Sequence, residues 1–138
     1  MSNRNFQYSF TSSKSPTEIF PFLLDPKNWW VGLFSEIIEG KSQAINDEFS
    51  FSAGDGLHYS RQKLTELVPG KRIAWLVTES NLSFLTNTNE WAGTKICFDL
   101  ETENGKTKVI FTHEGLVPHF ECYGGCSGAW MQYLERLE

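Results

Sequence analysis

Residues 91–116 read WAGTKICFDLETENGKTKVIFTHEGL and hold the clearest structural signal in the chain. Hydrophobic and polar side chains alternate on both sides of Asn104-Gly105, a dipeptide that favours tight turns between strands. The pattern predicts an antiparallel hairpin of residues 94–103 and 107–116. The side chains expected on its two apolar faces are Ile96, Phe98, Leu100, Val109, Phe111 and His113.

The chain then enters a stretch with helical periodicity. From about Glu121 the apolar residues are spaced so that they share one helix face; they are Ala129, Trp130, Tyr133, Leu134 and Leu137. Gly124, Gly125 and Gly128 lie near its start, where each costs about 0.5–1 kcal/mol relative to alanine. We therefore expect a closing helix that begins late or frays at its start.

The N-terminal quarter predicts one strand and two short helices. Residues 6–12 alternate in polarity, as a half-buried strand does. Residues 15–18, Ser-Pro-Thr-Glu, form a capping-box sequence with proline at the first helical position. Pro21 should distort or shorten that helix. A second turn or helix at residues 25–28 leads to Trp29 and Trp30.

The middle of the chain predicts further strands separated by turn residues. We expect strands at 34–38, 48–52, 57–68 and 72–80, with a hairpin at Pro69-Gly70 and a longer polar loop at 81–92. The 138 residues fit one domain, residues 1–138. The predicted fold class is α+β: a seven-stranded antiparallel sheet around a long C-terminal helix, with two short helices after the first strand.

Composition excludes some classes of function. The net charge is −5 and the longest basic run is Lys71-Arg72, so no cationic stripe is present for nucleic-acid phosphates. No apolar run approaches the ~20 residues of a membrane span, and the N-terminus does not resemble a signal peptide. We expect a cytoplasmic protein with no membrane or nucleic-acid partner. In that compartment Cys97, Cys122 and Cys126 are expected to be free thiols.

Several short motifs, in order, resemble one protein family. They are Pro16–Phe20, Trp29-Trp30, Pro69–Trp75, Thr112–Leu116 and Glu121–Trp130. Together they resemble the SRPBCC superfamily of START-like, helix-grip domains, and within it the homologues of the heat-shock-protein-90 ATPase activator. The resemblance implies a groove between sheet and C-terminal helix that holds a small apolar or amphipathic molecule. The activators themselves carry a further N-terminal domain that this sequence does not show, which weakens a co-chaperone function.

Candidate chemistry is sparse. His113, His119, Cys122 and Cys126 could be combined into a soft-ligand metal site such as zinc, but Cys-x3-Cys is a weak signal and structural packing is favoured. Cys122 with His119 could form a nucleophile and base, and again an inert thiol is favoured. No cofactor motif occurs. We predict no catalytic residue, no metal and no cofactor.

Three functions remain open from the sequence. The leading hypothesis is a binding module for a lipid-like or aromatic molecule, acting as a monomer or weak homodimer. Its predicted ligand-binding residues are Trp30, Phe34, Trp75, Ile96, Phe98, Phe111, His113 and Trp130. The alternatives are an enzyme that uses His113 as general acid or base, and an interaction protein with an exposed apolar patch. We also expect Trp75 to face Trp130, and Trp91 to guard the entrance of the groove.

Overall fold

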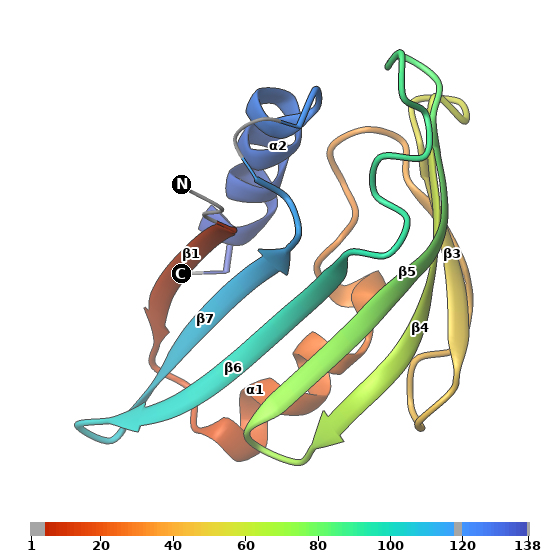
Figure 1. Cartoon of the computed structure of the whole chain (residues 1–138). Coiled ribbons are helices and arrows are strands. Elements are labelled where there is room, and N and C mark those ends of the chain that lie inside the picture. Colours follow the sequence, from red (N-terminus) through yellow and green to blue (C-terminus); the bar gives the residue numbers. More distant parts are fainter. Residues whose placement is uncertain (1–4, 118–119, 138) are drawn as a thin grey trace.

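The computed structural model describes residues 5–117 and 120–137 (Figure 1). One sheet, two α-helices and a short 3-10 helix make up the domain. In chain order the elements are β1 (Phe6–Ser12), α1 (Pro16–Leu24), η1 (Pro26–Asn28), β2 (Ile37–Gly40), β3 (Glu48–Ala53), β4 (His58–Val68), β5 (Arg72–Leu82), β6 (Lys95–Glu103), β7 (Lys106–Glu114) and α2 (Tyr123–Glu135). The predicted α+β class, with two short helices after the first strand, is confirmed.

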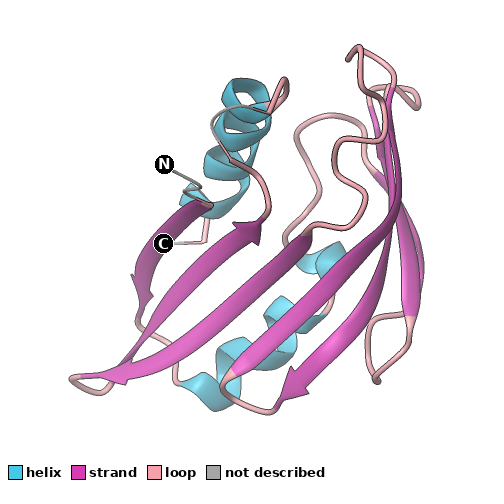
Figure 2. Ribbon diagram, in the orientation of Figure 1, coloured by secondary structure: helices cyan, strands magenta, loops and turns pink. Residues whose placement is uncertain are grey.

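The seven strands form one antiparallel sheet in the order β1-β7-β6-β5-β4-β3-β2. Only β1 departs from neighbour-to-neighbour pairing, because it lies beside the last strand, with Phe6 opposite His113. Both helices lie against the same face of the sheet (Figure 2). The domain therefore has two layers, and its core lies between the helices and the inward-facing side chains of the strands.

The two predicted hairpin turns are present. Asn104 and Gly105 have φ of 52° and 78°, the positive values that a tight two-residue connection between β6 and β7 requires. Gly70, between β4 and β5, has φ of 75°. These turns set the register of the strands that carry most of the core.

The first helix begins as its sequence predicts. Ser15 Oγ accepts a hydrogen bond from the Glu18 amide at 3.3 Å, and Glu18 Oε1 accepts one from the Ser15 amide at 2.9 Å. Helix α1 contains Pro21 and has only nine residues. Asp25 then caps η1 through a 3.0 Å hydrogen bond from the Lys27 amide, and this short turn delivers Trp29 and Trp30 to the core.

Trp29 occupies the centre of the aromatic core. Its ring centroid lies 5.1 Å from that of Phe98 and 6.2 Å from those of Trp75 and Trp130. The indole nitrogen donates to the Leu23 carbonyl at 2.8 Å. The expectation that Trp75 faces Trp130 is wrong: no ring contact joins them among the described residues, and Trp29 contacts both instead.

The strand predicted at 34–38 is also partly wrong. Strand β2 begins only at Ile37, because the Glu36 carboxylate accepts hydrogen bonds from the amides of Gly32, Leu33 and Phe34 at 2.7–3.3 Å. These bonds fold residues 32–36 into a loop. Phe34 thereby lies outside the sheet, on the loop that faces α2.

The glycines near the start of α2 give a first prediction. Gly124 and Gly128 are helical, and an added Cβ on either would meet no atom within 4 Å. Gly124→Ala and Gly128→Ala should each stabilise the domain by about 0.5–1 kcal/mol, because alanine loses less backbone entropy in a helix. Urea unfolding followed by circular dichroism measures the effect. An unchanged or lower midpoint would mean that this turn is not helical in solution.

Candidate functional site

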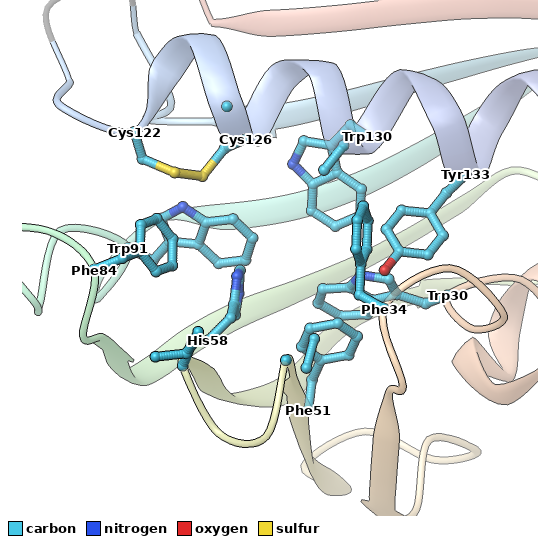
Figure 3. Close-up of a pocket in the computed structure, with 15 residues that line it drawn as sticks. Trp30, Phe34, Phe51, His58, Phe84, Trp91, Cys122, Cys126, Trp130 and Tyr133 are labelled. Carbon is cyan, nitrogen blue, oxygen red and sulfur yellow. A yellow bond between two sulfur atoms is a disulfide. The ribbon is translucent and has the colours of Figure 1, made fainter.

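A cavity of about 280 Å³ lies between α2, the β3–β4 hairpin and two loops (Figure 3). Its walls come from segments far apart in the sequence. The lining residues are Trp30, Phe34, Phe51, Ala53, Gly54, Leu57, His58, Phe84, Trp91, Cys122, Gly125, Cys126, Ala129, Trp130 and Tyr133. Aromatic side chains predominate, so the cavity offers flat apolar surfaces.

Two stacked ring pairs form part of this wall. Trp30 and Phe51 stack at a centroid distance of 3.9 Å, and Trp91 and Trp130 stack at 5.8 Å. Trp30 also contacts Trp130 at 5.0 Å. Each of the three tryptophans is at most 2 % exposed, so their positions are fixed by packing against the core as well as against one another.

The cavity has an apolar rim. Phe34, Leu57 and Phe84 line it and remain 42 %, 55 % and 54 % exposed. They come from three different connections: the loop before β2, the turn between β3 and β4, and the loop after β5. Large apolar side chains gathered around an opening are a typical feature of binding sites.

Two buried polar atoms of lining side chains have no hydrogen-bond partner among the described residues, His58 Nε2 and Trp91 Nε1. His58 begins β4, and its ring lies edge-to-face against Trp91 at 4.6 Å and against Phe51 at 5.2 Å. Burial lowers the pKa of His58 to about 4, so its imidazole is neutral at pH 7. Both nitrogens are themselves buried, so the surface that the cavity presents is almost wholly apolar.

Sequence reasoning missed His58, although a signal was present. Alternate residues of a strand point to one face of the sheet. His58 is therefore on the same face as Ser60, Gln62 and Leu64, which are all buried. Trp91 was expected to guard the entrance. It lines the cavity but is only 2 % exposed, so it belongs to the inner wall.

The predicted ligand-binding residues fall into two groups. Trp30, Phe34 and Trp130 line the cavity. The other five lie in the buried core outside the lining, and they are Trp75, Ile96, Phe98, Phe111 and His113. Trp29 packs on Phe98 and Trp130 packs on Phe111, at 5.1 and 4.7 Å. The inward faces of β6 and β7 are therefore covered by aromatic rings, and the cavity lies over β3 and β4.

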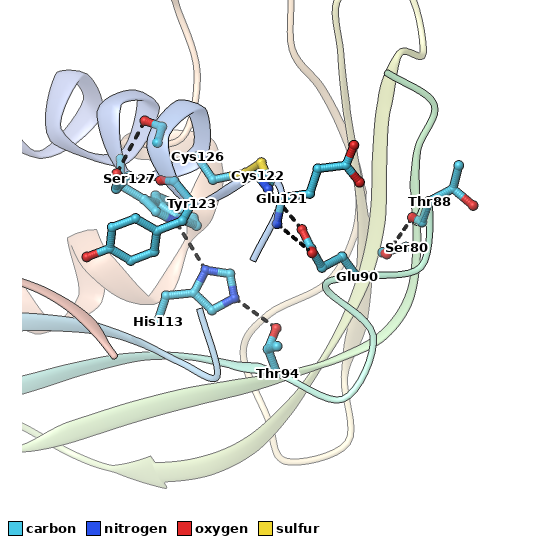
Figure 4. The surroundings of a disulfide bond; sticks show 12 residues. Ser80, Thr88, Glu90, Thr94, His113, Glu121, Cys122, Tyr123, Cys126 and Ser127 are labelled. Carbon is cyan, nitrogen blue, oxygen red and sulfur yellow. Dashed lines mark hydrogen bonds between the residues drawn. A yellow bond between two sulfur atoms is a disulfide. The ribbon is translucent and has the colours of Figure 1, made fainter. Parts of the chain in front are cut away.

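His113 is fully buried and joins two hydrogen bonds. Trp130 Nε1 lies 3.1 Å from His113 Nδ1, and Thr94 Oγ1 lies 2.8 Å from His113 Nε2. An indole N–H can only donate, so Nδ1 accepts and the ring proton must be on Nε2, donating to Thr94. The Thr94 hydroxyl in turn donates to the Trp91 carbonyl at 2.6 Å. This chain of bonds connects α2, β7 and the loop that carries Trp91 (Figure 4).

The same geometry removes the basis for His113 as a general acid or base. Burial, reinforced by the nearby His58, lowers the pKa of His113 to about 3. Both ring nitrogens are already engaged with protein groups, and the residue does not line the cavity. His113 acts here as a structural connector.

The expectation of three free thiols is wrong. Cys122 and Cys126 form a disulfide at the start of α2, with a Cα–Cα distance of 5.4 Å (Figures 3 and 4). Residues four apart lie on one helix face, so helix formation brings the two sulfurs together without help from the rest of the fold. Cys97 remains a free thiol, and burial followed by the nearby Glu114 raises its pKa to about 12.

The disulfide also argues against the metal site and the Cys122 nucleophile considered from the sequence. Cys122 and Cys126 are not thiolates available to a metal or a substrate, and His119 lies outside the described residues. Within residues 5–117 and 120–137, no group of three or more His, Cys, Asp or Glu side chains could hold a metal ion. The two sulfurs contribute apolar surface to the cavity wall.

Thiol counting tests the disulfide. We expect one reactive thiol per chain after denaturation without reductant, and three after reduction. Reduction, or the double change Cys122→Ala with Cys126→Ala, should lower the free energy of unfolding by about 2 kcal/mol, the chain-entropy value for so short a loop. Three thiols in the unreduced protein would contradict this assignment.

Two carboxylates fasten the start of α2 to the loop after β5. Glu90 accepts hydrogen bonds from the amides of Glu121 and Cys122 at 2.8 and 3.0 Å. Glu121 accepts in return from the amides of Thr86 and Asn87 at 3.0–3.2 Å, bonds that lower its pKa. The free amides of a helix start favour such anionic partners. The loop that supplies Phe84 and Trp91 is thereby held against the helix that supplies Trp130 (Figure 4).

A third carboxylate fastens the other end of the cavity. The Tyr133 hydroxyl donates to Glu36 at 2.5 Å, which joins the last turn of α2 to the loop before β2. Burial opposes ionisation of Glu36, but hydrogen bonds from Tyr133 and the amides of its loop outweigh burial and lower its pKa. Tyr133 presents its ring to the cavity while its hydroxyl is already occupied.

The fold and the motifs agree with one protein family. Residues 14–138 match the sequence model of the Activator of Hsp90 ATPase homolog 1-like proteins. The chain belongs to this family. The match extends from the capping box to the end of α2, so it covers both walls of the cavity. None of the curated proteins matches the chain significantly.

Solved structures show the same architecture in relatives of this Aha1-like domain. The Aha1 dimer from Colwellia psychrerythraea, solved in solution, is 25 % identical, with a TM-score of 0.72 over 97 % of this chain and 92 % of that one. A protein from Mesorhizobium loti is 20 % identical, with a TM-score of 0.74 over 97 % and 93 %. A third, from Rhizobium leguminosarum, is 17 % identical, with a TM-score of 0.72 over 99 % and 93 %. All three share the fold, and membership of the Aha1-like family rests on the match to the sequence model.

Proposed function

We propose that this Aha1-like domain binds a small, largely apolar molecule in the cavity between α2 and the β3–β4 hairpin. The observation that carries the proposal is the cavity itself: about 280 Å³, walled by stacked aromatic rings and entered past an apolar rim. Ligand sites are concave, mostly apolar and carry a few placed polar groups. This cavity is concave and mostly apolar, as such sites are.

Binding is favoured over catalysis because no reacting group is assembled there. His113, the residue proposed as acid or base from the sequence, is buried and engaged elsewhere. The lining hydroxyl, that of Tyr133, is bonded to Glu36. The lining cysteines are joined to each other. What remains is a wall of aromatic rings and the neutral imidazole of His58, which suits recognition.

Native mass spectrometry of the purified protein, followed by the same sample after denaturation, tests the proposal. We expect a mass excess that disappears on denaturation, and the released molecule identifies the ligand's chemical class. The native spectrum also tests our expectation of a monomer or weak homodimer. If the native and denatured masses agree, no ligand is retained, and this result would favour the alternative function as an interaction protein.

A matched pair of variants makes the test specific to the cavity. Ala129 lines the cavity, whereas Gln132, on the same helix, is exposed and does not. Ala129→Phe should fill part of the space and weaken ligand retention at least tenfold. Gln132→Phe adds a comparable ring outside and should leave retention unchanged. Equal behaviour of the two variants would contradict binding at this site.

A further inference from the structure

We infer that the Cys122–Cys126 disulfide is a redox switch for the cavity. A dithiol reductant converts the bond to two thiols, which loosens the start of α2 and weakens the binding of a ligand. Two electrons and two protons pass from the reductant to the two sulfurs, and the reductant becomes a disulfide. Because it acts on the ligand site, the switch rests on the proposed function and adds its regulation.

The start of α2 is intrinsically weak. Gly124, Gly125 and Gly128 lie within its first six residues, and each destabilises a helix interior relative to alanine. Cys122 occupies the N-cap position, but its side chain makes no hydrogen bond to the described amides of the helix, so the usual stabilisation by a cap is missing. The disulfide therefore supplies a constraint that the sequence of this turn lacks, and its loss permits local opening.

The two sulfurs belong to the cavity wall. Both cysteines line the cavity, and their exposed fractions are only 3 % and 5 %. Figure 3 shows the disulfide beside the Trp91 indole. Two unbonded sulfur atoms need more space than two bonded ones, so reduction in this packed wall displaces the helix start or Trp91. Gly125 and Ala129 line the cavity from the same part of α2, so the displacement alters the surroundings of the ligand directly.

The bond can be broken and re-formed without a change of fold. Its cysteines are four residues apart, so the thiols remain on one helix face and meet again whenever the turn forms. Cys97 offers no competing partner, because it is fully buried on the opposite face of the sheet, where its sulfur lies 3.6 Å from Arg72 Nη2. In a reducing compartment, the one that the sequence predicts, disulfides are usually transient or redox-sensing.

The ligand and the redox state of the disulfide are coupled in both directions. If reduction weakens binding by a given factor, a bound ligand stabilises the disulfide against reduction by the same factor. Opening of this turn recovers at most the chain entropy that the disulfide removes, which for so short a loop corresponds to roughly thirtyfold. We expect a coupling of about tenfold, within that limit.

Hydrogen–deuterium exchange with and without dithiothreitol tests the structural part of the switch without any ligand. Amides of residues 126–129 should exchange about tenfold faster in the reduced protein, because they exchange through local opening of the helix start. The comparison uses exchange times at which the amides of β6 and β7 remain protected in both forms, so global unfolding does not contribute.

Naphthalene, a neutral apolar probe, tests the effect on the ligand site. Its dissociation constant, measured by ligand-observed NMR titration, should be about tenfold higher for the protein reduced with dithiothreitol than for the oxidised protein. Thiol counting on the same samples confirms one thiol per chain in the oxidised form and three in the reduced form.

Three variants assign the effect to the disulfide and to the weak helix start. Cys122→Ser with Cys126→Ser should bind naphthalene as the reduced protein does, and dithiothreitol should not change its affinity. Gly124→Ala with Gly128→Ala strengthens the turn at positions that do not line the cavity, so it should reduce the redox effect to about threefold or less. Cys97→Ala removes the remaining cysteine and should keep the full effect.

The outcomes separate the switch from the proposed function. If naphthalene binds neither form and native mass spectrometry shows no retained ligand, the proposed function fails, and the switch has no ligand to control. If naphthalene binds both forms with equal affinity, the domain binds small molecules but the switch is overturned. Exchange at residues 126–129 that does not respond to reduction, or a redox effect that disappears in Cys97→Ala, would overturn the switch as well.

Discussion

Replacing Trp130 with alanine should lower the free energy of unfolding by about 3–5 kcal/mol, the range for truncating a buried aromatic residue. Trp130 is 2 % exposed and its ring contacts those of Trp29, Trp30, Trp91 and Phe111. Because domains of this size have total stabilities of roughly 5–15 kcal/mol, the loss would be a large share. Urea unfolding, monitored by circular dichroism, measures it.

Trp130→Phe separates ring packing from hydrogen bonding. It keeps most of the apolar area but leaves His113 Nδ1 without the donor that now lies 3.1 Å away. We expect an intermediate loss, of about 1–3 kcal/mol. If the alanine variant lost less than about 1 kcal/mol, α2 would not be anchored as the structure shows.

Acidification from pH 7 to pH 5 should produce the second large loss of stability. Burial lowers the pKa of His58 and His113 from 6.5 to about 4 and about 3. Between the folded-state pKa values and 6.5, the unfolded chain binds protons that the folded protein does not bind. Stability therefore falls as the pH falls. At pH 5 the loss is about 2 kcal/mol per histidine, from 1.36 kcal/mol for each unit below 6.5.

The pH range of the loss, not its direction, distinguishes the histidines from the carboxylates. For a base with a lowered pKa, the stabilising effect is complete above pH 6.5 and is lost on the way down to pH 3–4. Carboxylates with lowered pKa values, such as Glu36 and Glu121, act in the same direction but only below their ordinary value of 4.5. Unfolding midpoints at pH 7, 6 and 5 therefore report mainly on histidines. His58→Phe should reduce the dependence by about half of the part due to these two residues, and a profile identical to the wild type would contradict burial of His58.

The sheet could be predicted because its signals are local. Asn104-Gly105 and Pro69-Gly70 specify turns, and alternation on either side specifies which residues face inward. The capping box at Ser15 locates the start of α1 in the same way. The loop at residues 32–36 could not be foreseen, because it is formed by one carboxylate, Glu36, that folds back on three amides.

The cavity could be predicted only in part, because it depends on where α2 lies across the sheet. The alternation of apolar and polar residues along the strands correctly identified Phe98, Phe111 and His113 as inward-facing. It could not show that Trp29 and Trp130 cover them, which displaces the open space towards β3 and β4. The disulfide was missed for a different reason: compartment was used to predict thiols, whereas the i, i+4 spacing of Cys122 and Cys126 already placed the sulfurs together.

The rim residues Phe34, Leu57 and Phe84 belong to three connections, whereas the strand register and the buried rings are set elsewhere. Substitutions at exposed positions usually alter stability by no more than about 0.5 kcal/mol. The rim residues can therefore be substituted, one loop at a time, without changing the sheet or the buried core. A domain of this kind can acquire a new molecular preference through a few surface changes, and can be engineered along the same route.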